Sequence, residues 1–249
     1  MGKIETLLLR ANDPIAQRRF YCEILGMQEF GNGDVGYTEQ EAKIRFLPAN
    51  APYKPKPGDL YWKIALGVPD IELACRQLVQ RGIEVSAPNQ FQDVGYLAKF
   101  TDPEGFTVEL IEHWFKGSRQ EEEINLSQLG GGAHLNLITL RAVDIEPIQK
   151  ICTDLGMAPL SIQPVDSHGF TLYFFAFTSQ RPPSSDLTSI KNRQWLYQRK
   201  YTLLEVQHLR NVDNITVPDD SSAGYHGTVL SGLKTDIESN NLMMLLKVN

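Results

Sequence analysis

Three side chains far apart in the sequence are of the types that a metal site requires. His134 and His226 each stand ten residues before an Asp that precedes a predicted helix, Asp144 and Asp236. Glu205 lies between them in a strand-like stretch, and two histidines with one carboxylate form the ligand set of non-haem iron oxygenases. Two ordinary strand-end histidines are the alternative, because successive side chains of a strand face opposite ways and a bulge would be needed to bring them together.

The elements that must position these residues form a repeat. An apolar strand, an Asp turn, an amphipathic helix and a Gly stop occur at residues 4–27, 61–83 and 134–157, and a weaker copy starts at residue 226. An Asp suits the helix start because its carboxylate accepts free backbone N–H bonds, and a Gly suits the left-handed position after the end. These residues are Asp13, Asp70, Asp144 and Asp236 at the starts, and Gly26, Gly82 and Gly156 at the ends.

Strand-like stretches follow each of the first three helices, so the unit is a βαβββ module. The sequence predicts an α+β fold with curved mixed sheets, built from three complete modules and a partial fourth. Because equivalent positions in modules one and two lie 56 or 57 residues apart, we expect these modules to pair as one domain over residues 1–115. Residues 116–132, with a charge run and a glycine triplet, read as a linker, and residues 133–249 hold the third and the incomplete fourth module.

Composition and charge narrow the functional classes. The 249 residues carry a net charge of −6 without a Lys/Arg cluster, which argues against nucleic-acid binding. The three cysteines have no CxxC spacing, and the N-terminus lacks a signal-peptide pattern, so we expect a cytoplasmic protein without a membrane span. No GxGxxG, P-loop, GxSxG or HExxH motif occurs, which leaves nucleotide-binding and serine-hydrolase readings unsupported.

Several motifs occur in one order and spacing. Phe20-Tyr21 precede Leu25-Gly26-Met27, Val68-Pro69-Asp70 open the second helix, and residues 102–106 (DPEGF) lead into Val108-Glu109-Leu110. With the βαβββ repeat, these motifs resemble the vicinal oxygen chelate superfamily, which contains glyoxalases, bleomycin-resistance proteins and dioxygenases. Residues 138–144 (ITLRAVD), 172–177 (LYFFAF) and 198–208 (QRKYTLLEVQH) are similar to a module of glyoxalase I.

The resemblance implies where a divalent ion would bind. In such proteins, side chains from the first and last strands of two facing modules hold the ion, and the first-strand ligand lies seven residues before the helix-opening Asp. That position holds Thr6, Lys63, Leu137 and Val229 in the four modules, or Asn136 in module three if it is aligned from Gly156, while the last strands offer Arg45, Glu109 and Glu205. Lysine, leucine and valine are poor ligands. We therefore expect Glu109 opposite Lys63 in a metal-free N-terminal cleft, as an ion pair or a substrate clamp.

Two arginines are candidates for binding a carboxylate. Arg141 matches an arginine that contacts glutathione in glyoxalase I, and Arg10 is its counterpart in module one. A guanidinium can donate two parallel hydrogen bonds to a carboxylate. Pairing with a neighbouring acidic residue such as Asp13 or Asp144 is the structural alternative.

These residues support three hypotheses. The first is a glyoxalase I-like metal-dependent lyase or isomerase, lactoylglutathione lyase-like if active, with Glu205 and Glu109 catalytic and Arg141, Arg10 and Lys63 binding the ligand. The second is a metal-free small-molecule-binding protein or degenerate paralogue. The third is a non-haem iron dioxygenase that uses Glu205, His134 and His226.

Cofactors and partners follow from these hypotheses. A Zn, Ni or Fe ion and glutathione are possible cofactors, and a small molecule is the expected partner. The incomplete fourth module leaves a strand edge of module three uncovered, so the C-terminal part either packs on the first domain or completes its sheet in a homodimer.

Overall fold

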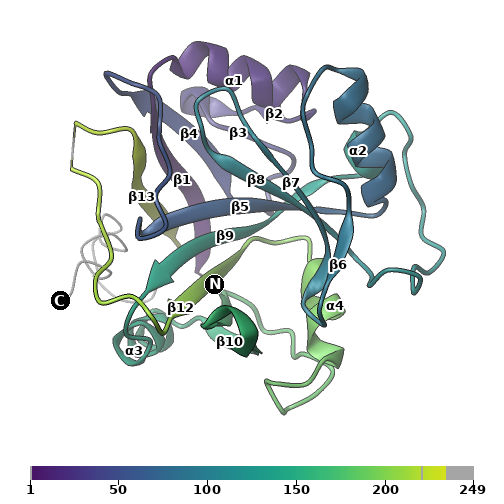
Figure 1. Cartoon of the computed structure of the whole chain (residues 1–249), viewed down its shortest axis with the longest axis vertical. Helices are drawn as coiled ribbons and strands as arrows, with labels where there is room; N and C mark the ends of the chain where they lie inside the picture. Colours follow the sequence, from purple (N-terminus) through teal and green to yellow (C-terminus); the bar gives the residue numbers. More distant parts are fainter. Residues whose placement is uncertain (1, 220, 234–249) are drawn as a thin grey trace.

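The computed structural model describes residues 2–219 and 221–233. It confirms the α+β class, with two curved mixed sheets and helices packed on their outer faces (Figure 1). Module one contains β1 (Lys3–Ala11), α1 (Pro14–Glu23), β2 (Gln28–Glu29), β3 (Val35–Gly36) and β4 (Lys43–Pro48). Module two contains β5 (Tyr61–Val68), α2 (Ile71–Gln80), β6 (Asn89–Phe91), β7 (Gly95–Thr101) and β8 (Thr107–Glu112). Module three contains β9 (His134–Ala142), α3 (Glu146–Asp154), β10 (Ala158–Val165), β11 (Phe170–Ala176), α4 (Lys191–Tyr197) and β12 (Leu203–Leu209), and β13 (Gly224–Ser231) follows.

The helix ends have the predicted capping residues. The Asp13 carboxylate accepts from the N–H groups of Ile15 and Ala16, and the Asp70 carboxylate accepts from that of Leu73. In the third helix the N-cap residue is Ile145, so Asp144 lies one residue before the predicted position, and its carboxylate accepts from the N–H of Glu146, the first residue of the helix. Gly26, Gly82 and Gly156 all have φ between 78° and 86°, the left-handed conformation expected after a helix. Asp236 lies outside the described residues.

The pairing of the modules differs from the prediction. Modules two and three form one eight-stranded sheet of order β10-β11-β12-β9-β5-β8-β7-β6, in which β5 and β9 are antiparallel neighbours. Module one joins β13 in a separate five-stranded sheet of order β13-β1-β4-β3-β2. The strands of modules one and two therefore lie in different sheets, because β5 uses its free edge to pair with β9.

Modules one and two nevertheless share a hydrophobic core. The Phe20 ring on α1 lies 6.5 Å from the Phe100 ring on β7, and the Tyr21 hydroxyl donates to Asp102 at 2.9 Å. The Glu104 carboxylate accepts from the N–H groups of Asn12 and Asp13. The DPEGF turn of module two thus binds the backbone just before the helix of module one and joins the two modules.

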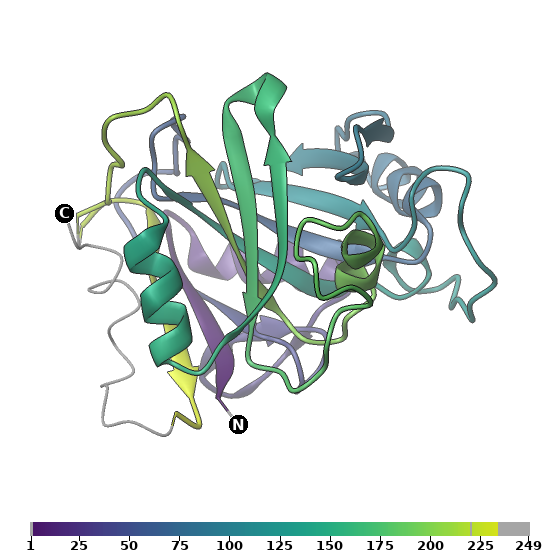
Figure 2. The same ribbon diagram turned by 90° about the horizontal axis from the view of Figure 1, so that it is seen from below.

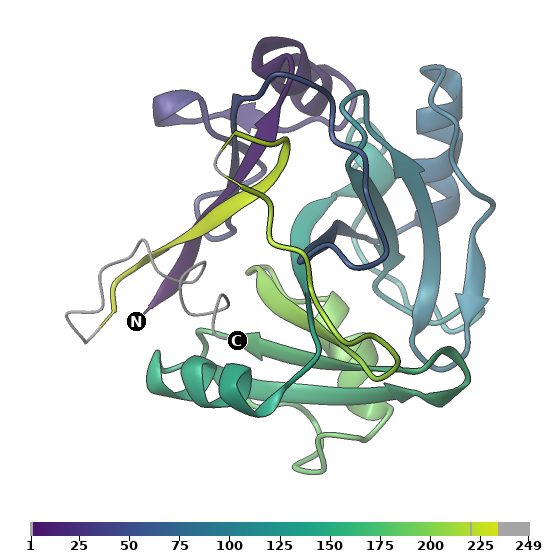
Figure 3. The same ribbon diagram turned by 60° about the vertical axis from the view of Figure 1, so that its left-hand side comes forward.

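β13 places the C-terminal part of the chain on module one. It runs antiparallel to β1, from Lys3 opposite Ser231 to Arg10 opposite Gly224 (Figure 3). Of the two arrangements expected for the partial fourth module, this matches packing on the first domain. The strand covers the edge of β1 that would otherwise be unpaired.

The insert of module three carries α4, which packs against module two. The Tyr197 hydroxyl donates to the carbonyl of Val94 at 2.8 Å, and Arg193 forms an ion pair with Asp93. Figure 2 shows this short helix beside the strands of module two. Within the described residues, no helix is long and apolar enough to cross a bilayer, and all three cysteines are free thiols.

The first two glycines of the triplet in the predicted linker, Gly130 and Gly131, are buried near α2. Gly130 has a φ of 56°, and a Cβ there would lie 2.8 Å from the Cβ of Val68. Gln77 on α2 holds the turn, because its side chain accepts from the N–H of Gly130 and donates to the carbonyls of Leu126 and Gln128. Close packing here therefore requires glycine.

We predict that Gly130→Ala lowers the free energy of unfolding by about 1–3 kcal/mol, because it adds both backbone strain and a steric overlap. Gly117→Ala is the matched control, since Gly117 has a φ of 79° but a Cβ there would meet no atom within 4 Å. Urea denaturation of both variants measures the difference. Equal losses would show that packing on Val68 contributes nothing.

Candidate ligand-binding cleft

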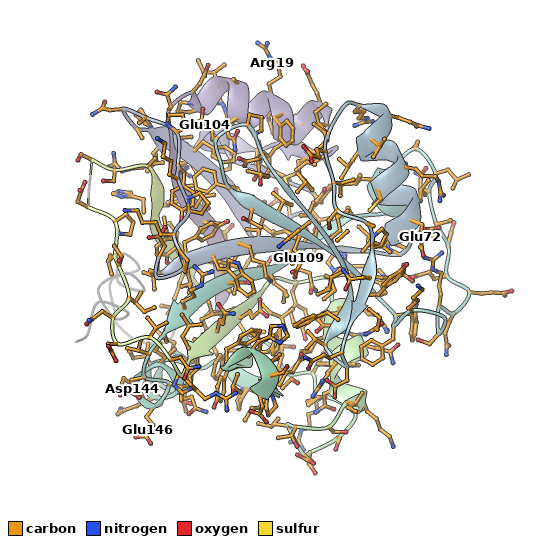
Figure 4. The ribbon with its side chains drawn as sticks, in the orientation of Figure 1. Arg19, Glu72, Glu104, Glu109, Asp144 and Glu146 are labelled. Carbon is orange, nitrogen blue, oxygen red and sulfur yellow. The ribbon has the colours of Figure 1, made fainter. Side chains whose placement is uncertain are left out.

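Four strands in the middle of the eight-stranded sheet bring the polar residues of the cleft together. β5 lies between β8 and β9, and β12 lies on the far side of β9. In these pairings Ala65 lies opposite Glu109, and Thr139 lies opposite both Lys63 and Glu205. Figure 4 shows Glu109 near the middle of the molecule, far from Asp144 at its lower edge. Lys63 thus meets the last-strand glutamates of both modules.

The ammonium of Lys63 is the centre of this group. Its Nζ atom lies 2.9 Å from Glu109 Oε1 and 2.9 Å from Glu205 Oε2. It also donates to the hydroxyl of Thr139 at 3.2 Å, and that hydroxyl donates to Glu205. An ammonium has three N–H donors, so all three are used.

The group is buried and has a formal charge of −1 with both carboxylates ionised. The side chains of Lys63, Glu109 and Glu205 are 4%, 13% and 3% exposed. Burial alone would lower the pKa of Lys63, but the charges and hydrogen bonds of the two glutamates outweigh it and raise the pKa. Burial raises the pKa of Glu109, the charge of Glu205 adds to this shift, and Lys63 opposes it. The ammonium therefore stays charged and compensates one of the two carboxylates.

A local irregularity in β5 shapes the cleft. The register between β5 and β9 shifts between Tyr61 and Lys63, and both Trp62 and Lys63 line the cavity. The ammonium of Lys63 lies 4.8 Å from the centre of the Trp62 ring, within the range of a cation–π contact. The Trp62 ring also meets the Phe170 ring edge-on, at 6.5 Å. The bulge thus places an aromatic wall next to the charged floor.

The cavity above this floor has a volume of about 330 Å³. Its walls are mainly apolar and aromatic and come from β5 to β9, β11 and α4. They include Trp62, Phe91, Val94, Leu97, Ile111, Leu137, Phe170, Leu172 and Tyr197. This size and lining are typical of sites for small organic molecules.

The predicted metal site of His134, Glu205 and His226 is not assembled. His226 lies on β13 in the other sheet, where Arg10 Nε donates to its Nδ1 at 3.1 Å. His134 begins β9, five residues before Thr139, and at about 3.3 Å per residue this puts it far from Glu205. This metal prediction is therefore wrong, because the three side chains are not among the described residues whose ligand atoms lie close enough together for one ion.

Only one group of acidic and histidine side chains in the described ranges has ligand atoms close enough for a metal ion. It consists of Asp70, Glu72 and Glu112, outside the cleft. Arg119 already forms ion pairs with all three, at 3.0, 2.6 and 2.6 Å. These carboxylates therefore have a cationic partner from the chain itself.

The two arginine candidates lie apart. Arg141 Nε donates to Gln207 at 3.0 Å, its Nη1 donates to the carbonyls of Lys56 and Asp59, and its guanidinium lies 5.1 Å from the centre of the Trp62 ring. Burial lowers its pKa. Arg141 thus makes a cation–π contact with the Trp62 ring. The hydrogen bonds that it forms with the described residues go to neither Asp13 nor Asp144, so the structural alternative of such a pair is not seen. Arg10, on β1, donates to His226 and to the carbonyl of Pro48, in the other sheet.

Thr6 and Arg45 occupy the first- and last-strand ligand positions of module one, and their arrangement differs from that of the group around Lys63. Arg45 and the Thr6 hydroxyl both donate to Asp34, and Val229 lies opposite Thr6 on β13. Arg45, at the last-strand position of module one, thus forms an ion pair with Asp34. The eight-stranded sheet therefore contains the stronger candidate cleft.

Sequence reasoning found Lys63 and Glu109 as partners but assigned Glu205 to another site, and it missed Thr139. Leu137, the counted ligand position of module three, lies opposite Ala65 and lines the cavity with an apolar side chain. Thr139 is two residues further along β9, so it has the same orientation. That alternation is the sequence signal that could have identified it.

The divalent ion that the resemblance implies does not fit this cleft. Both last-strand glutamates already bind the Lys63 ammonium, and Leu137 offers no ligand atom. An ion at this place would lie beside an ammonium whose pKa is raised, so the two like charges would repel each other.

Comparisons with known proteins agree with the fold. Residues 3–110 match the model of the glyoxalase/bleomycin resistance protein/dioxygenase superfamily. Glyoxalase I from Zea mays superposes with a TM-score of 0.64 at 17% identity, over 92% of this chain and 74% of the maize chain. A variant of the maize enzyme gives a TM-score of 0.65 at 16% identity, over 99% and 79% of the two chains. No curated protein sequence matches the chain. The predicted resemblance to the superfamily is confirmed for residues 3–110, and the structural similarity confirms the glyoxalase I-like fold.

Proposed function

We propose that this chain binds a small organic molecule, without a metal ion, in the cleft between modules two and three. The observation that carries the proposal is the Lys63 ammonium, whose three donors are bound by Glu109, Glu205 and Thr139. The chain's own cation compensates the charge of one carboxylate that would otherwise attract a metal ion.

The walls and floor of the cleft favour an aromatic or apolar ligand that carries a positive charge. Trp62, Phe91, Phe170 and Tyr197 offer ring surfaces. The buried floor of Lys63, Glu109 and Glu205 has a formal charge of −1, and the exposed Lys99 also lines the cavity. Among the described residues, the Glu109 carboxylate is bonded only to Lys63, through Oε1. Its second oxygen can accept a hydrogen bond from a ligand N–H group.

A pair of matched dyes tests this proposal. We predict that 9-aminoacridine, a planar cation at pH 7, binds about tenfold more tightly than the planar anion 9-anthracenecarboxylate. Trp62→Ala should weaken binding of the cation about tenfold, because the principal ring contact is lost. Titrations followed by dye fluorescence measure both effects.

Val79→Ala is the control variant, since Val79 is an exposed side chain on α2 outside the cleft, and it should leave dye binding unchanged. Equal affinity for the two dyes, or binding that Trp62→Ala does not alter, would contradict a cation-selective cleft.

A glyoxalase I-like lyase is the second candidate function. The two last-strand glutamates, Glu109 and Glu205, favour it, because a carboxylate at this place could move a proton between two carbons. Lys63 and Leu137 at the first-strand positions weigh against the metal that such chemistry uses, and Arg141 already bonds Gln207. Lactoylglutathione lyase activity that depends on Glu205 and on an added Zn or Ni ion would favour this candidate.

Two expectations from the sequence remain proposals. The free thiols of Cys22, Cys75 and Cys152 fit a reducing compartment such as the cytoplasm. A homodimer can be tested by size-exclusion chromatography with light scattering, which gives the mass of the particle directly.

A further inference from the structure

A second and larger cavity lies away from the cleft, at the junction of the three modules. Its volume is about 710 Å³, and it is bounded by the end of α1, the outer side of α2, the 37–41 loop, the 122–133 segment and the start of β9. Hydrogen bonds hold these walls: Gln77 binds the glycine turn, and Arg81 donates to the carbonyls of Glu23 and Ile24. The proposed function makes no use of this space.

Glu41 is the buried carboxylate of this cavity. The residue is 1% exposed, and its oxygens accept from the Thr38 hydroxyl at 2.9 Å and from the N–H of Leu135 at 2.7 Å. No lysine or arginine among the described residues forms an ion pair with it, although Lys43 and the exposed Lys200 act on it at longer range. A buried carboxylate without a cationic partner is costly, so a ligand cation would be stabilised here.

His134 supplies a second polar atom to the same cavity. The residue is 2% exposed and lines the cavity, and its Nδ1 atom, which is itself buried, has no hydrogen-bond partner among the described residues. The ring lies against Gly67 on β5, where a Cβ would come within 2.4 Å of it. The imidazole is thus fixed in place with one nitrogen left unused, which is rare for a buried polar group.

The charged side chains around the cavity favour a cation. Glu41, Glu122 and Glu123 are acidic, while Arg81 and Lys200 are basic. Arg81 is engaged with backbone carbonyls and Glu122 with His113, at 3.1 Å. Glu41 is therefore the carboxylate that combines burial with the lack of a cationic partner.

We propose that this cavity binds a small organic cation with N–H donors, an alkylamine or an alkylguanidine, whose charged nitrogen pairs with Glu41 while His134 Nδ1 makes a second contact. The walls from Ile24, Leu25 and Leu129 accommodate the alkyl part. This site is independent of the cleft that contains Lys63.

Isothermal titration calorimetry with 1,4-diaminobutane, and with 1,4-butanediol as its neutral counterpart, tests the proposal. We expect the diamine to bind and the diol not to bind. Glu41→Gln preserves shape and acceptor geometry but removes the charge, so it should weaken diamine binding about 10- to 100-fold. His134→Phe, which keeps an aromatic ring without nitrogen, should weaken it about tenfold and serves as the second variant if Glu41→Gln does not fold.

Two controls separate this site from the rest of the molecule. Glu84→Gln removes an exposed carboxylate that does not line this cavity and should leave binding unchanged, as should Trp62→Ala in the cleft. Equal binding of diamine and diol, no binding of the diamine, or a folded Glu41→Gln variant with the wild-type affinity would overturn the proposal. Loss of diamine binding on Trp62→Ala would instead assign the diamine to the cleft and would also overturn it.

Discussion

Replacing Lys63 by Met lowers the free energy of unfolding at pH 7 by about 3–5 kcal/mol. The substitution keeps most of the apolar stem but removes the ammonium that lies 2.9 Å from both Glu109 and Glu205. Two buried carboxylates are then left next to each other without a cation. Urea denaturation followed by circular dichroism measures the loss.

Lys99→Met is the matched control for this prediction. Lys99 lies opposite Glu109 on the neighbouring strand β7 but is exposed, so the same substitution should change stability little. Similar losses in the two variants would contradict a central role for the Lys63 ion pairs.

The loss in the Lys63→Met variant should depend on pH. In the folded protein, burial and Glu205 already raise the pKa of Glu109 above its usual value of 4.5, and Lys63 limits that shift. A carboxyl whose folded pKa is raised reduces stability as pH rises through the interval between its unfolded and folded pKa values. The variant should therefore recover part of its deficit relative to the wild type as pH falls from 7 towards 4.5. A deficit that stays constant or grows on acidification would contradict this account.

Lys63→His should convert the cleft into a metal site. The introduced imidazole would replace the ammonium by a neutral ligand between the two glutamates, a set of one nitrogen and two carboxylates that suits Zn²⁺. We expect the variant to bind Zn²⁺ with a Kd on the order of 1 μM, whereas the wild type binds it at least 100-fold more weakly. Calorimetric titration with Zn²⁺ measures both affinities.

Lys99→His controls for a histidine added near the cleft and should bind Zn²⁺ no better than the wild type. Adding Glu205→Gln to Lys63→His should weaken binding about tenfold or more, because one charged ligand is lost. Indistinguishable Zn²⁺ affinities for wild type, Lys63→His and Lys99→His would mean that the ammonium does not decide metal binding.

The local parts of the fold could be predicted from the sequence. Asp13 and Asp70 at helix starts and Gly26 and Gly82 at helix ends act through neighbours within four residues, so one sequence suffices to identify them. The partnership of Lys63 and Glu109 was also predictable, because both residues belong to the same module.

The joining of that pair to Glu205 could not be predicted in the same way. It depends on β5 pairing with β9 across the segment 116–132, and no local pattern specifies which modules share a sheet. The prediction that His134 and His226 bind one metal ion was wrong for the same reason. Equal spacing before an Asp does not determine which sheet each strand joins. The bulge at Trp62 likewise follows from strand pairing and has no signal of its own in the sequence.

Metal content is the most direct test of the central claim that the Lys63 ammonium takes the place of a metal ion in the cleft. The protein should be purified without chelators and measured by inductively coupled plasma mass spectrometry, together with Glu109→Ala. We predict that Zn, Ni and Fe are each well below one ion per chain in both proteins. One tightly bound ion per chain in the wild type that is lost on Glu109→Ala would contradict the account.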